Sequence, residues 1–513
     1  MRWERVLAAV RQRRLDGAVV TGVTEDSRRV RPGMVFVARR GFHVDGHDLL
    51  EQARDAGASL TVGDRQLGPG LPDVVVACSD RALADLVSAW HGDPGRHLVM
   101  AGITGTNGKT TTTHLLAAIL RAAGFAAGSV GSVGYAFGSE RLPAEHTTPP
   151  PEVLYALLAR WRAAGATHAA VEVSAQALSQ GRVAACRFRV AALTGFSRDH
   201  GEYYTDAAAY LQAKLSLFRD LPSGGVAVLP TADPHLPAFV SAAAGRPTVL
   251  YGPDGEVRLL DMHPAGAAGT SLRLRLGAQG ARQLRLPLPG RHNVHNALCA
   301  AAAALALGVQ ADAIAAGLEA APPVPGRGTL LVDTAGRLVL IDYAHNPEAL
   351  RAVLRLAREL APGRVHAVLG PRGQRDRGKR PLMGAVLAAL ADAATITCDR
   401  PAGEDPGEAA QTMVQAALDC GLHARFLPDR AVALAAASAA LEPGDCLVVT
   451  GKGMEPWLGD GPMDGTTDLE VLSGCLPGLA PAPAVTEGAW RGAAGRRRAE
   501  GQVGPIQRTA TGV

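Results

Sequence analysis

Residues 99–120 place a strand, a glycine-rich turn and a helix in direct succession, and this stretch constrains the fold most strongly. The apolar run from Val99 to Ile103 suits a buried strand, and the segment after Lys109 has apolar residues at helical spacing. The N–H groups of a helix's first turn and the helix dipole favour a phosphate. In the turn, Gly105-Thr106-Asn107-Gly108, glycine lets the backbone approach phosphate oxygens, while Lys109 can reach the outer phosphates. The stretch predicts a nucleotide site, with a plain glycine turn as the alternative.

The pattern is not a full phosphate loop, because Ile103 stands six residues before Lys109, where that loop has glycine. The Thr110 hydroxyl, directly after the lysine, can ligate magnesium.

Bulk properties set limits on the class of protein. A chain of 513 residues is long for one core and predicts about three domains. The net charge of +4 and the lack of a long basic run in the motif-bearing part argue against a nucleic-acid partner. The 7 cysteines form no Cys-x-x-Cys pair, which argues against a disulfide framework and a zinc site. No segment reads as a signal peptide or membrane span, so we expect a cytoplasmic protein without membrane insertion, and a monomer.

Turn-rich junctions divide the chain into four parts. Residues 1–93 form a first unit that ends in a polar turn. Residues 94–322 alternate strand-like apolar runs with alanine-rich helical runs, which predicts a mostly parallel sheet covered by helices. Residues 323–475 begin a third unit after a proline-rich hinge, and residues 476–513 read as a disordered tail.

Two polar residues near strand ends of the second unit are candidate metal ligands. Glu172 closes the apolar run before Ser174, where a carboxylate is costly unless it is paired or bound to a cation. His200 follows the next apolar run and, with Thr110, completes a donor set that suits magnesium. A structural ion pair for Glu172 and an idle loop histidine are the alternatives. Lys214, on a helix, reads by itself as a solvated lysine.

The third unit also has polar clusters where its strands are expected to end. The strand at 338–341 runs into Asp342-Tyr343-Ala344-His345-Asn346-Pro347, and later strands end near Gly370, Asp399 and Gly451. Open α/β sheets bind ligands at such carboxyl ends, so we expect a second binding surface here.

These landmarks, in this order, resemble the Mur ligase family, and most closely its MurE type. Thr-Gly-Thr-Asn-Gly-Lys-Thr-Thr at 104–111 marks the wider family, which includes folylpolyglutamate and cyanophycin synthetases. Asp-Ser-Arg at 26–28, Asp-Gly-His at 45–47 and Gly-Lys-Arg-Pro-Leu-Met-Gly at 378–384 are specific to the MurE type. The similarity covers roughly residues 20–460.

The resemblance implies an α/β fold with three domains: an N-terminal one for the UDP group, a central phosphate-loop ATPase domain and a C-terminal Rossmann-like domain. It also implies an ATP-dependent amide ligase of peptidoglycan precursor synthesis, with ATP and Mg²⁺ as cofactors. Such an enzyme adds an amino acid (meso-diaminopimelate, L-lysine or another) to UDP-N-acetylmuramoyl-L-alanyl-D-glutamate. ATP first phosphorylates the glutamate carboxylate, and the amine of the amino acid then attacks the acyl phosphate.

By match, the resemblance also assigns roles to individual residues. The catalytic set is Lys109, Glu172, His200 and Lys214, of which Thr110, Glu172, His200 and a carbamylated Lys214 would hold metal. The ATP set is Gly105, Thr106, Asn107, Gly108, Lys109, Thr110, Thr111, Asn296, Arg327 and Asp342. The UDP-substrate set is Ser27, Phe42, His43, Val44, Thr147, Thr148, Ser174, Gln180 and Arg182. The amino-acid set is Arg380, Asp399, Arg400, Pro401, Ala402, Gly451 and Glu455.

Several motifs depart from the family pattern. The usual Asp-Asn-Pro-Arg of the third domain reads Asp399-Arg400-Pro401-Ala402, which removes a bidentate partner for the distal carboxylate of meso-diaminopimelate. Met454 replaces a usual histidine, and Asn346 replaces the threonine that is common in this type. This pattern suits a divergent paralogue.

Two other functions remain open at this point. One is the same ligase chemistry in another pathway, such as a cyanophycin-like or specialised-metabolite amide bond. The other is a non-catalytic nucleotide-binding homologue.

Overall fold

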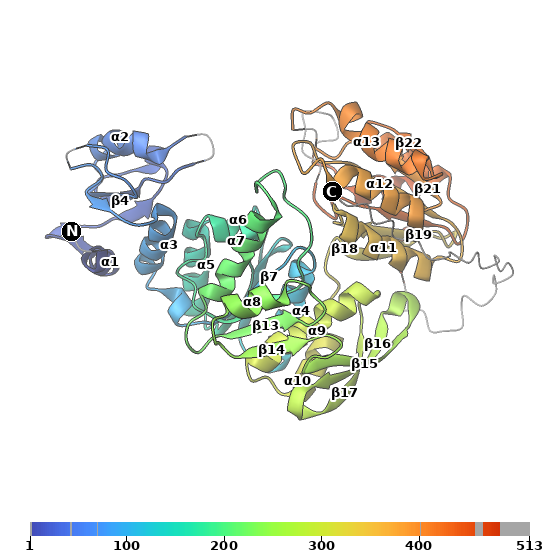
Figure 1. Cartoon of the computed structure of the whole chain (residues 1–513), viewed down its shortest axis with the longest axis horizontal. Helices are drawn as coiled ribbons and strands as arrows, with labels where there is room; N and C mark the ends of the chain where they lie inside the picture. The colour runs from blue at the N-terminus through green and yellow to red at the C-terminus, as the bar shows by residue number, and fades with distance from the viewer. Residues whose placement is uncertain (1–2, 42–43, 69, 401, 457–464, 483–513) are drawn as a thin grey trace, which may run out of the picture.

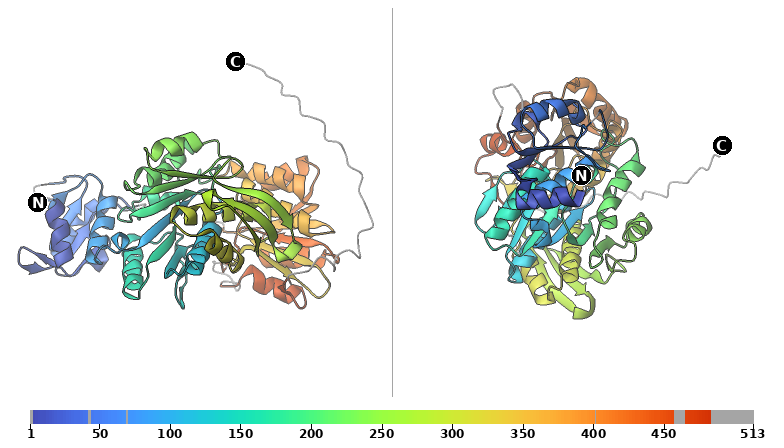
Figure 2. Two further views of the ribbon diagram at one scale, coloured as in Figure 1. Left: turned by 90° about the horizontal axis from the view of Figure 1, so that it is seen from below. Right: turned by 90° about the vertical axis from the view of Figure 1, so that its left-hand side faces the viewer.

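The computed structural model describes residues 3–41, 44–68, 70–400, 402–456 and 465–482. They form three α/β lobes in a row, with the first lobe at one end and the C-terminal lobe at the other (Figure 1; Figure 2). In this part of the chain no helix is long and apolar enough to cross a membrane.

The first lobe is built on a four-stranded parallel sheet with the order β3-β4-β5-β6. Its strands are β3 (Gly22–Thr24), β4 (Met34–Val37), β5 (Leu60–Gly63) and β6 (Val74–Val75), beside the small pair β1 (Arg14–Leu15) and β2 (Ala18–Val19). Its helices are α1 (Trp3–Gln12), α2 (Leu50–Asp55) and α3 (Ser79–Trp90). Helix α3 packs against α5 of the next lobe, and one apolar cluster continues from Val35 and Leu83 to Tyr155 and Phe239. The first two lobes therefore share a core.

The central lobe contains an 11-stranded sheet with the order β10-β9-β8-β11-β7-β12-β13-β14-β15-β16-β17. Its strands are β7 (Val99–Thr104), β8 (Ala127–Gly131), β9 (Gly134–Phe137), β10 (Glu140–Leu142), β11 (His168–Glu172), β12 (Phe188–Leu193), β13 (Val226–Pro230), β14 (Thr248–Tyr251), β15 (Val257–Pro264), β16 (Thr270–Leu276) and β17 (Ala281–Leu286). Its helices are α4 (Lys109–Ala122), α5 (Pro151–Ala163), α6 (Ala175–Ser179), α7 (Ala207–Arg219), α8 (Leu236–Ala242), α9 (Arg291–Ala306) and α10 (Ala311–Glu319).

The predicted parallel arrangement holds from β8 to β14, where helices cover both faces and the strands are apolar along their length. In the register, Glu172 pairs with Ile103 and Leu193 pairs with Thr104, so three carboxyl ends meet at one edge beside the glycine turn. Both ends of this mostly parallel sheet are antiparallel, with β9 and β10 at one end and β15, β16 and β17 at the other. Residues in β16 alternate between buried and exposed, as in a sheet with one solvated face.

The C-terminal lobe has a seven-stranded sheet with the order β22-β21-β20-β23-β19-β18-β24. Its strands are β18 (Arg327–Val332), β19 (Leu338–Asp342), β20 (Val365–Leu369), β21 (Ala393–Ile396), β22 (His423–Phe426), β23 (Cys446–Val449) and β24 (Ala480–Pro481). Its helices are α11 (Pro347–Leu360), α12 (Lys379–Leu390), α13 (Pro406–Asp419), α14 (Arg430–Ala439) and α15 (Asp468–Cys475). The lobe packs around two apolar clusters of its own.

The prediction that the tail begins at residue 476 is wrong by a few residues. Strand β24 pairs with β18, and the Ala482 N–H donates to the Leu330 carbonyl. Composition alone could not find this strand, because a two-residue pairing leaves no periodic pattern. Residues 483–513 lie outside the described residues.

Candidate active site

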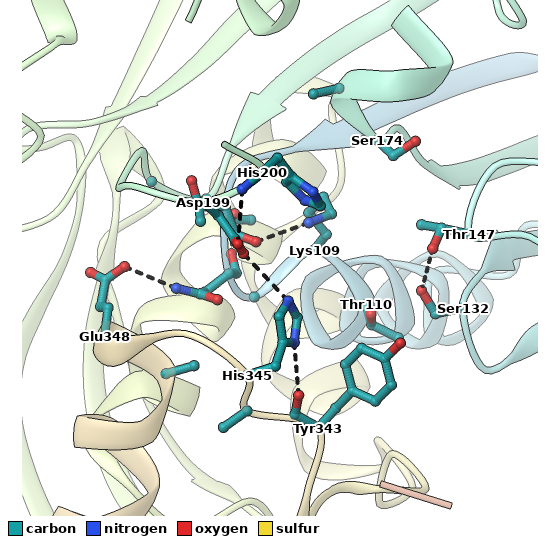
Figure 3. A pocket seen from close by; sticks show the side chains of 18 of the residues that line it. Lys109, Thr110, Ser132, Thr147, Ser174, Asp199, His200, Tyr343, His345 and Glu348 are labelled. Carbon is teal, nitrogen blue, oxygen red and sulfur yellow. Dashed lines mark hydrogen bonds and ion pairs between the residues drawn. The ribbon is translucent and has the colours of Figure 1, made fainter. Parts of the chain in front are cut away.

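A cavity of about 1050 Å³ lies between the central and C-terminal lobes. The glycine turn and the start of α4 form one wall, and the loops after β19 and β20 form the opposite wall. The close-up shows side chains from both lobes directed into this space (Figure 3).

The glycine turn has a shape that only glycine accommodates at two positions. Gly105 and Gly108 have φ values of 148° and 83°. A Cβ on Gly105 would overlap the Thr194 hydroxyl, and a Cβ on Gly108 would overlap the Asn296 amide oxygen. Thr194 Oγ1 also donates to the Asn107 carbonyl at 2.5 Å, so the turn is fixed from beneath.

Two lysines donate to the carbonyl of Gly105. Lys109 Nζ lies 3.1 Å from this oxygen and 3.0 Å from the Thr106 carbonyl, and Lys214 Nζ approaches the Gly105 oxygen at 2.7 Å. The Lys214 side chain is buried behind the turn, over the ring of Tyr210, and does not line the cavity. Burial, and secondly the charge of Lys109, lower the pKa of Lys214 well below its usual value. The prediction that Lys214 is a solvated helix lysine is therefore wrong.

Glu172 is buried and faces oxygen and nitrogen donors of the cavity wall. Its Oε1 accepts from Thr110 Oγ1 at 3.1 Å, and its Oε2 accepts from the Ser132 N–H at 2.9 Å. A hydroxyl beside a carboxylate is a donor pair that suits Mg²⁺. Lys214 as a free amine does not suit a cation. Among the described residues, no group of three His, Cys, Asp or Glu side chains could hold a metal on its own.

His200 lies at the mouth of this region in a left-handed conformation, with φ of 59°. Its Nδ1 is 3.4 Å from Glu202 Oε1, and its ring is 5.6 Å from the Tyr210 ring. His200 lines the same cavity as Thr110 and Glu172.

The residues predicted to hold the muramoyl dipeptide form one network. Thr148 Oγ1 donates to the Glu172 carbonyl at 2.7 Å, and Arg182 Nη1 donates to the Thr148 carbonyl at 2.6 Å. Gln180 fixes the Arg182 guanidinium at 2.9 Å, while Ser174 caps α6. Thr147 Oγ1 lies 2.9 Å from Ser132 Oγ.

Two of the predicted nucleotide contacts beyond the turn, Arg327 and Asp342, line the cavity from the C-terminal lobe, whereas Asn296 lies beside Gly108 on α9 of the central lobe. Arg327 stacks 4.2 Å above the Tyr343 ring and pairs with Asp342 in the ladder between β18 and β19. Burial raises the pKa of Asp342 to about 6, although the Arg327 charge opposes this shift. Asn296 Nδ2 donates to Asn293 Oδ1 at 3.3 Å.

Much of the predicted amino-acid set is already paired within the protein. Arg380 donates through both terminal nitrogens to Glu404, at 2.9 and 2.7 Å. Asp399 forms ion pairs with Arg372 Nε at 2.8 Å and with Lys452 Nζ at 2.9 Å. These pairs hold the pKa of the Asp399 carboxyl below its usual value, although burial alone would raise it.

The cavity gathers most of the predicted site residues, but not all of them. It is lined by Thr106, Asn107, Gly108, Lys109, Thr110, Thr111, Thr147, Thr148, Glu172, Ser174, Arg182, His200, Asn296, Arg327, Asp342, Arg380 and Glu455. Its lining does not include Ser27, Val44, Gly105, Gln180, Lys214, Asp399, Arg400, Ala402 or Gly451. Ser27 and Val44 belong to the first lobe, and Ala402 has a left-handed φ of 49°. The predictions for Phe42, His43 and Pro401 lie outside the described residues.

Sequence reasoning missed the residues that join the two walls. Asp199 accepts from Lys379 at 3.2 Å and lies 3.3 Å from His345 Nε2, as the close-up shows for His345 (Figure 3). Burial alone would raise the pKa of Asp199, but the hydrogen bond from His345 and the charge of Lys379 outweigh it and lower this pKa. All three residues stand in or beside motifs that the sequence had singled out.

Fold and site together define a class: nucleotide-dependent α/β proteins in which a phosphate loop on one lobe faces a second α/β lobe across a cavity. Three family descriptions match the chain in order: "Mur ligase family, catalytic domain" at 19–83, "Mur ligase middle domain" at 103–304 and "Mur ligase, glutamate ligase domain" at 326–453. The chain belongs to the Mur ligase family.

Similar proteins agree with this assignment. A Streptomyces coelicolor protein named UDP-N-acetylmuramoyl-L-alanyl-D-glutamate--2,6-diaminopimelate ligase is 39% identical over 85% of this chain and 88% of its own length. A protein of the same name from Geobacillus thermodenitrificans is 36% identical over 87% of this chain and 92% of its own. A solved structure of that name has a TM-score of 0.64 and 28% identity over 91% of this chain and 98% of its own. Mycobacterium tuberculosis folylpolyglutamate synthase, solved with ADP and AMPPCP, shares the fold at a TM-score of 0.60 and 23% identity, over 72% of this chain and 91% of its own.

Proposed function

We propose that this protein is an ATP-dependent amide ligase of the MurE type. It joins an amino acid to UDP-N-acetylmuramoyl-L-alanyl-D-glutamate in peptidoglycan precursor synthesis. The observation that carries this proposal is the cavity itself, where the phosphate loop and the residues matched to the muramoyl dipeptide line one wall and the C-terminal lobe lines the other.

The reaction has two steps. ATP transfers its γ-phosphoryl group to the free carboxylate of the D-glutamate residue, which gives an acyl phosphate and ADP. The amine of the incoming amino acid then attacks the acyl carbon, and phosphate leaves. Lys109 and the first-turn amides of α4 would neutralise charge on the phosphates, and the C-terminal lobe would bring the amine within reach.

We propose that Thr110, Glu172 and His200 hold Mg²⁺. The metal would supply charge neutralisation for the transferring phosphoryl group. The support is the pairing of the Thr110 hydroxyl with the Glu172 carboxylate on the cavity wall, with His200 lining the same space.

We further propose that Lys214 is carbamylated in the active enzyme. A carbamate forms when an uncharged amine attacks CO₂, so a buried lysine beside a second cation is a suitable precursor. The modification turns a cation into an anion that can serve a metal. Its carboxylate would extend from the place where the Lys214 amine now reaches the Gly105 carbonyl.

The identity of the added amino acid rests on the C-terminal lobe. The similar proteins named above carry 2,6-diaminopimelate in their names. This chain has Arg400 and Ala402 at the position of the usual Asp-Asn-Pro-Arg motif, and its Arg380 is bound by Glu404. We therefore propose that the enzyme accepts an amino acid whose distal group needs no arginine at position 402.

The test is phosphate release from ATP with Mg²⁺ and UDP-N-acetylmuramoyl-L-alanyl-D-glutamate across a panel of amino acids, with each product identified by mass. We expect one amino acid to give a product heavier than the dipeptide substrate by that residue. If no member of the panel supports phosphate release while ATP still binds, the proposed acceptor is contradicted, and the result favours a ligase of another pathway or the non-catalytic homologue.

A further inference from the structure

Asn346 occupies the junction between the phosphate loop and the C-terminal lobe, and its whole amide group is used there. The side chain is fully buried. Its Oδ1 accepts from the Ala349 N–H at 3.0 Å and so caps α11. Its Nδ2 donates to Asn107 Oδ1 at 2.9 Å and to Asp199 Oδ2 at 3.0 Å. One side chain therefore joins the start of α11 to two points of the central lobe.

Both points belong to the binding wall of the central lobe. Asn107 lies in the phosphate loop, and its own carbonyl is held by Thr194 from beneath. Asp199 follows β12, is buried, and also receives Lys379 at 3.2 Å. The first turn of α11 adds Glu348, whose Oε2 accepts from Asn107 Nδ2 at 2.9 Å.

Other contacts between these lobes are more exposed. Arg198 pairs with Asp376 at 3.2 Å, but its side chain is 62% exposed. Arg375 pairs with Glu202 at 2.5 Å, and its side chain is 48% exposed. Exposed ion pairs contribute little, because water screens them. The buried contacts around Asn346 are therefore the ones that water screens least.

We infer that Asn346 is a positioning residue that couples nucleotide binding to docking of the C-terminal lobe. Phosphates that bind the main chain of the loop fix the position of Asn107. Asn346 transmits that position to α11 and so to the wall that presents the amino acid. The inference rests on the proposed function, because it describes how the two halves of the same site are brought into register.

Two substitutions separate this role from simple helix capping. Asn346→Ser keeps an oxygen that can cap α11 but removes both Nδ2 hydrogen bonds. Asn346→Asp keeps the cap and the size but places a carboxylate against Asp199. Asp429→Ser is the matched control, because Asp429 caps α14 through the Val432 N–H, away from the cavity.

Docking can be measured without the acceptor substrate, by small-angle scattering and by a donor–acceptor dye pair on the two lobes. The scattering profile and the energy transfer between the dyes are both recorded with and without AMPPCP and Mg²⁺. We expect the wild type and Asp429→Ser to become more compact with the nucleotide. Asn346→Ser should bind AMPPCP within about 3-fold of the wild type but lose the compaction, and its kcat should fall roughly 10- to 100-fold. Asn346→Asp should be more severely affected.

Asn107→Ala provides a second route to the same contact without any change in α11. If the two asparagines act together, the loss of kcat in the double variant Asn107→Ala/Asn346→Ser should be less than additive in activation free energy, because both single variants remove the same Asn107–Asn346 contact. Additive losses would overturn the inference, as would nucleotide-driven compaction in Asn346→Ser or its absence in the wild type. If the wild type compacts but makes no amide product with any amino acid, the proposed function fails while the coupling stands.

Discussion

The environment of Lys214 is unusual for a lysine on a helix. It is buried behind the phosphate loop, and its hydrogen bond to the Gly105 carbonyl is shared with a second lysine. Two ammonium groups at one carbonyl repel each other, which favours the uncharged amine on the more buried side chain. This environment suits conversion of Lys214 to an anion.

We expect Lys214→Ala to lower kcat by at least about 100-fold, because the carbamate would be lost from the phosphoryl-transfer site. Added acetate or another short carboxylate should restore part of the activity by occupying the space of the missing group. Steady-state phosphate release measures both effects. Full activity of the variant would contradict the carbamate, and so would loss of activity that no carboxylate restores.

Asp342 makes stability depend on pH in an identifiable direction. Its pKa rises from 3.8 to about 6 on folding, so the native state holds a proton that the unfolded chain has released. Stability is therefore greatest at the acid end and falls as the pH rises toward 6, by about 3 kcal/mol in all. Asp342→Asn should remove this pH dependence. The free energy of unfolding of the variant, relative to that of the wild type, should therefore be higher at about pH 7.5 than at about pH 5.

Urea unfolding followed at both pH values, together with ATP affinity, tests this prediction. We propose that Asp342 contacts the nucleotide in the cavity that it lines, so the variant should also bind ATP more weakly. An equal stability difference at the two pH values would mean that Asp342 does not titrate as its burial implies.

At the scale of elements, the junction between β7 and α4 forms the proposed phosphate site of the nucleotide. The turn fits closely over Thr194 and Asn296, and its glycines adopt backbone angles that other residues avoid. The sequence was sufficient to predict this element, because turn, lysine and helix are contiguous.

Gly108→Ala should abolish ATP binding and reduce thermal stability, since a Cβ would overlap the Asn296 side chain at a φ of 83°. Isothermal titration with AMPPCP and thermal unfolding measure the two effects. Gly124→Ala is a suitable control, because Gly124 also has a positive φ, of 83°, but a Cβ added there would meet no atom of the described residues within 4 Å. Similar ATP affinity in both variants would contradict the steric argument.

Elements defined by distant partners were harder to predict. The short strand β24 depends on pairing with β18, which lies far from it in the sequence, rather than on a local pattern. The same reason explains the missed site residues. Asp199 is 147 positions from Asn346 and 180 from Lys379, so no local spacing relates them. The sequence indicated the strand ends correctly, but not which ends face each other.

At the scale of the whole molecule, the three lobes are joined in two different ways. The first and central lobes share a continuous apolar cluster, whereas the C-terminal lobe has clusters of its own and meets the central lobe through hydrogen bonds and ion pairs. Apolar burial holds lobes together permanently, while a polar interface permits relative motion.

We expect the buried and exposed polar contacts to differ in their effect on activity. Arg375→Gln should change kcat by less than about 5-fold, and by less still at high salt, since the Arg375 side chain is 48% exposed where it pairs with Glu202. Asp199→Asn should lower kcat by at least about 100-fold at any salt concentration, because it leaves the buried Lys379 without its carboxylate. Measurement of kcat at low and high KCl distinguishes the two. Equal salt dependence would contradict the distinction.

The shared core of the first two lobes also bears on how such a protein can change over evolutionary time. We expect the first and central lobes to be inherited as one block, because dividing them would expose the apolar interior that they share. The C-terminal lobe can be replaced by recombination near the proline-rich hinge, provided that the incoming segment still meets Asn107 and Asp199. A lineage could in this way exchange the amino acid that it adds while its recognition of the nucleotide-linked sugar stays the same.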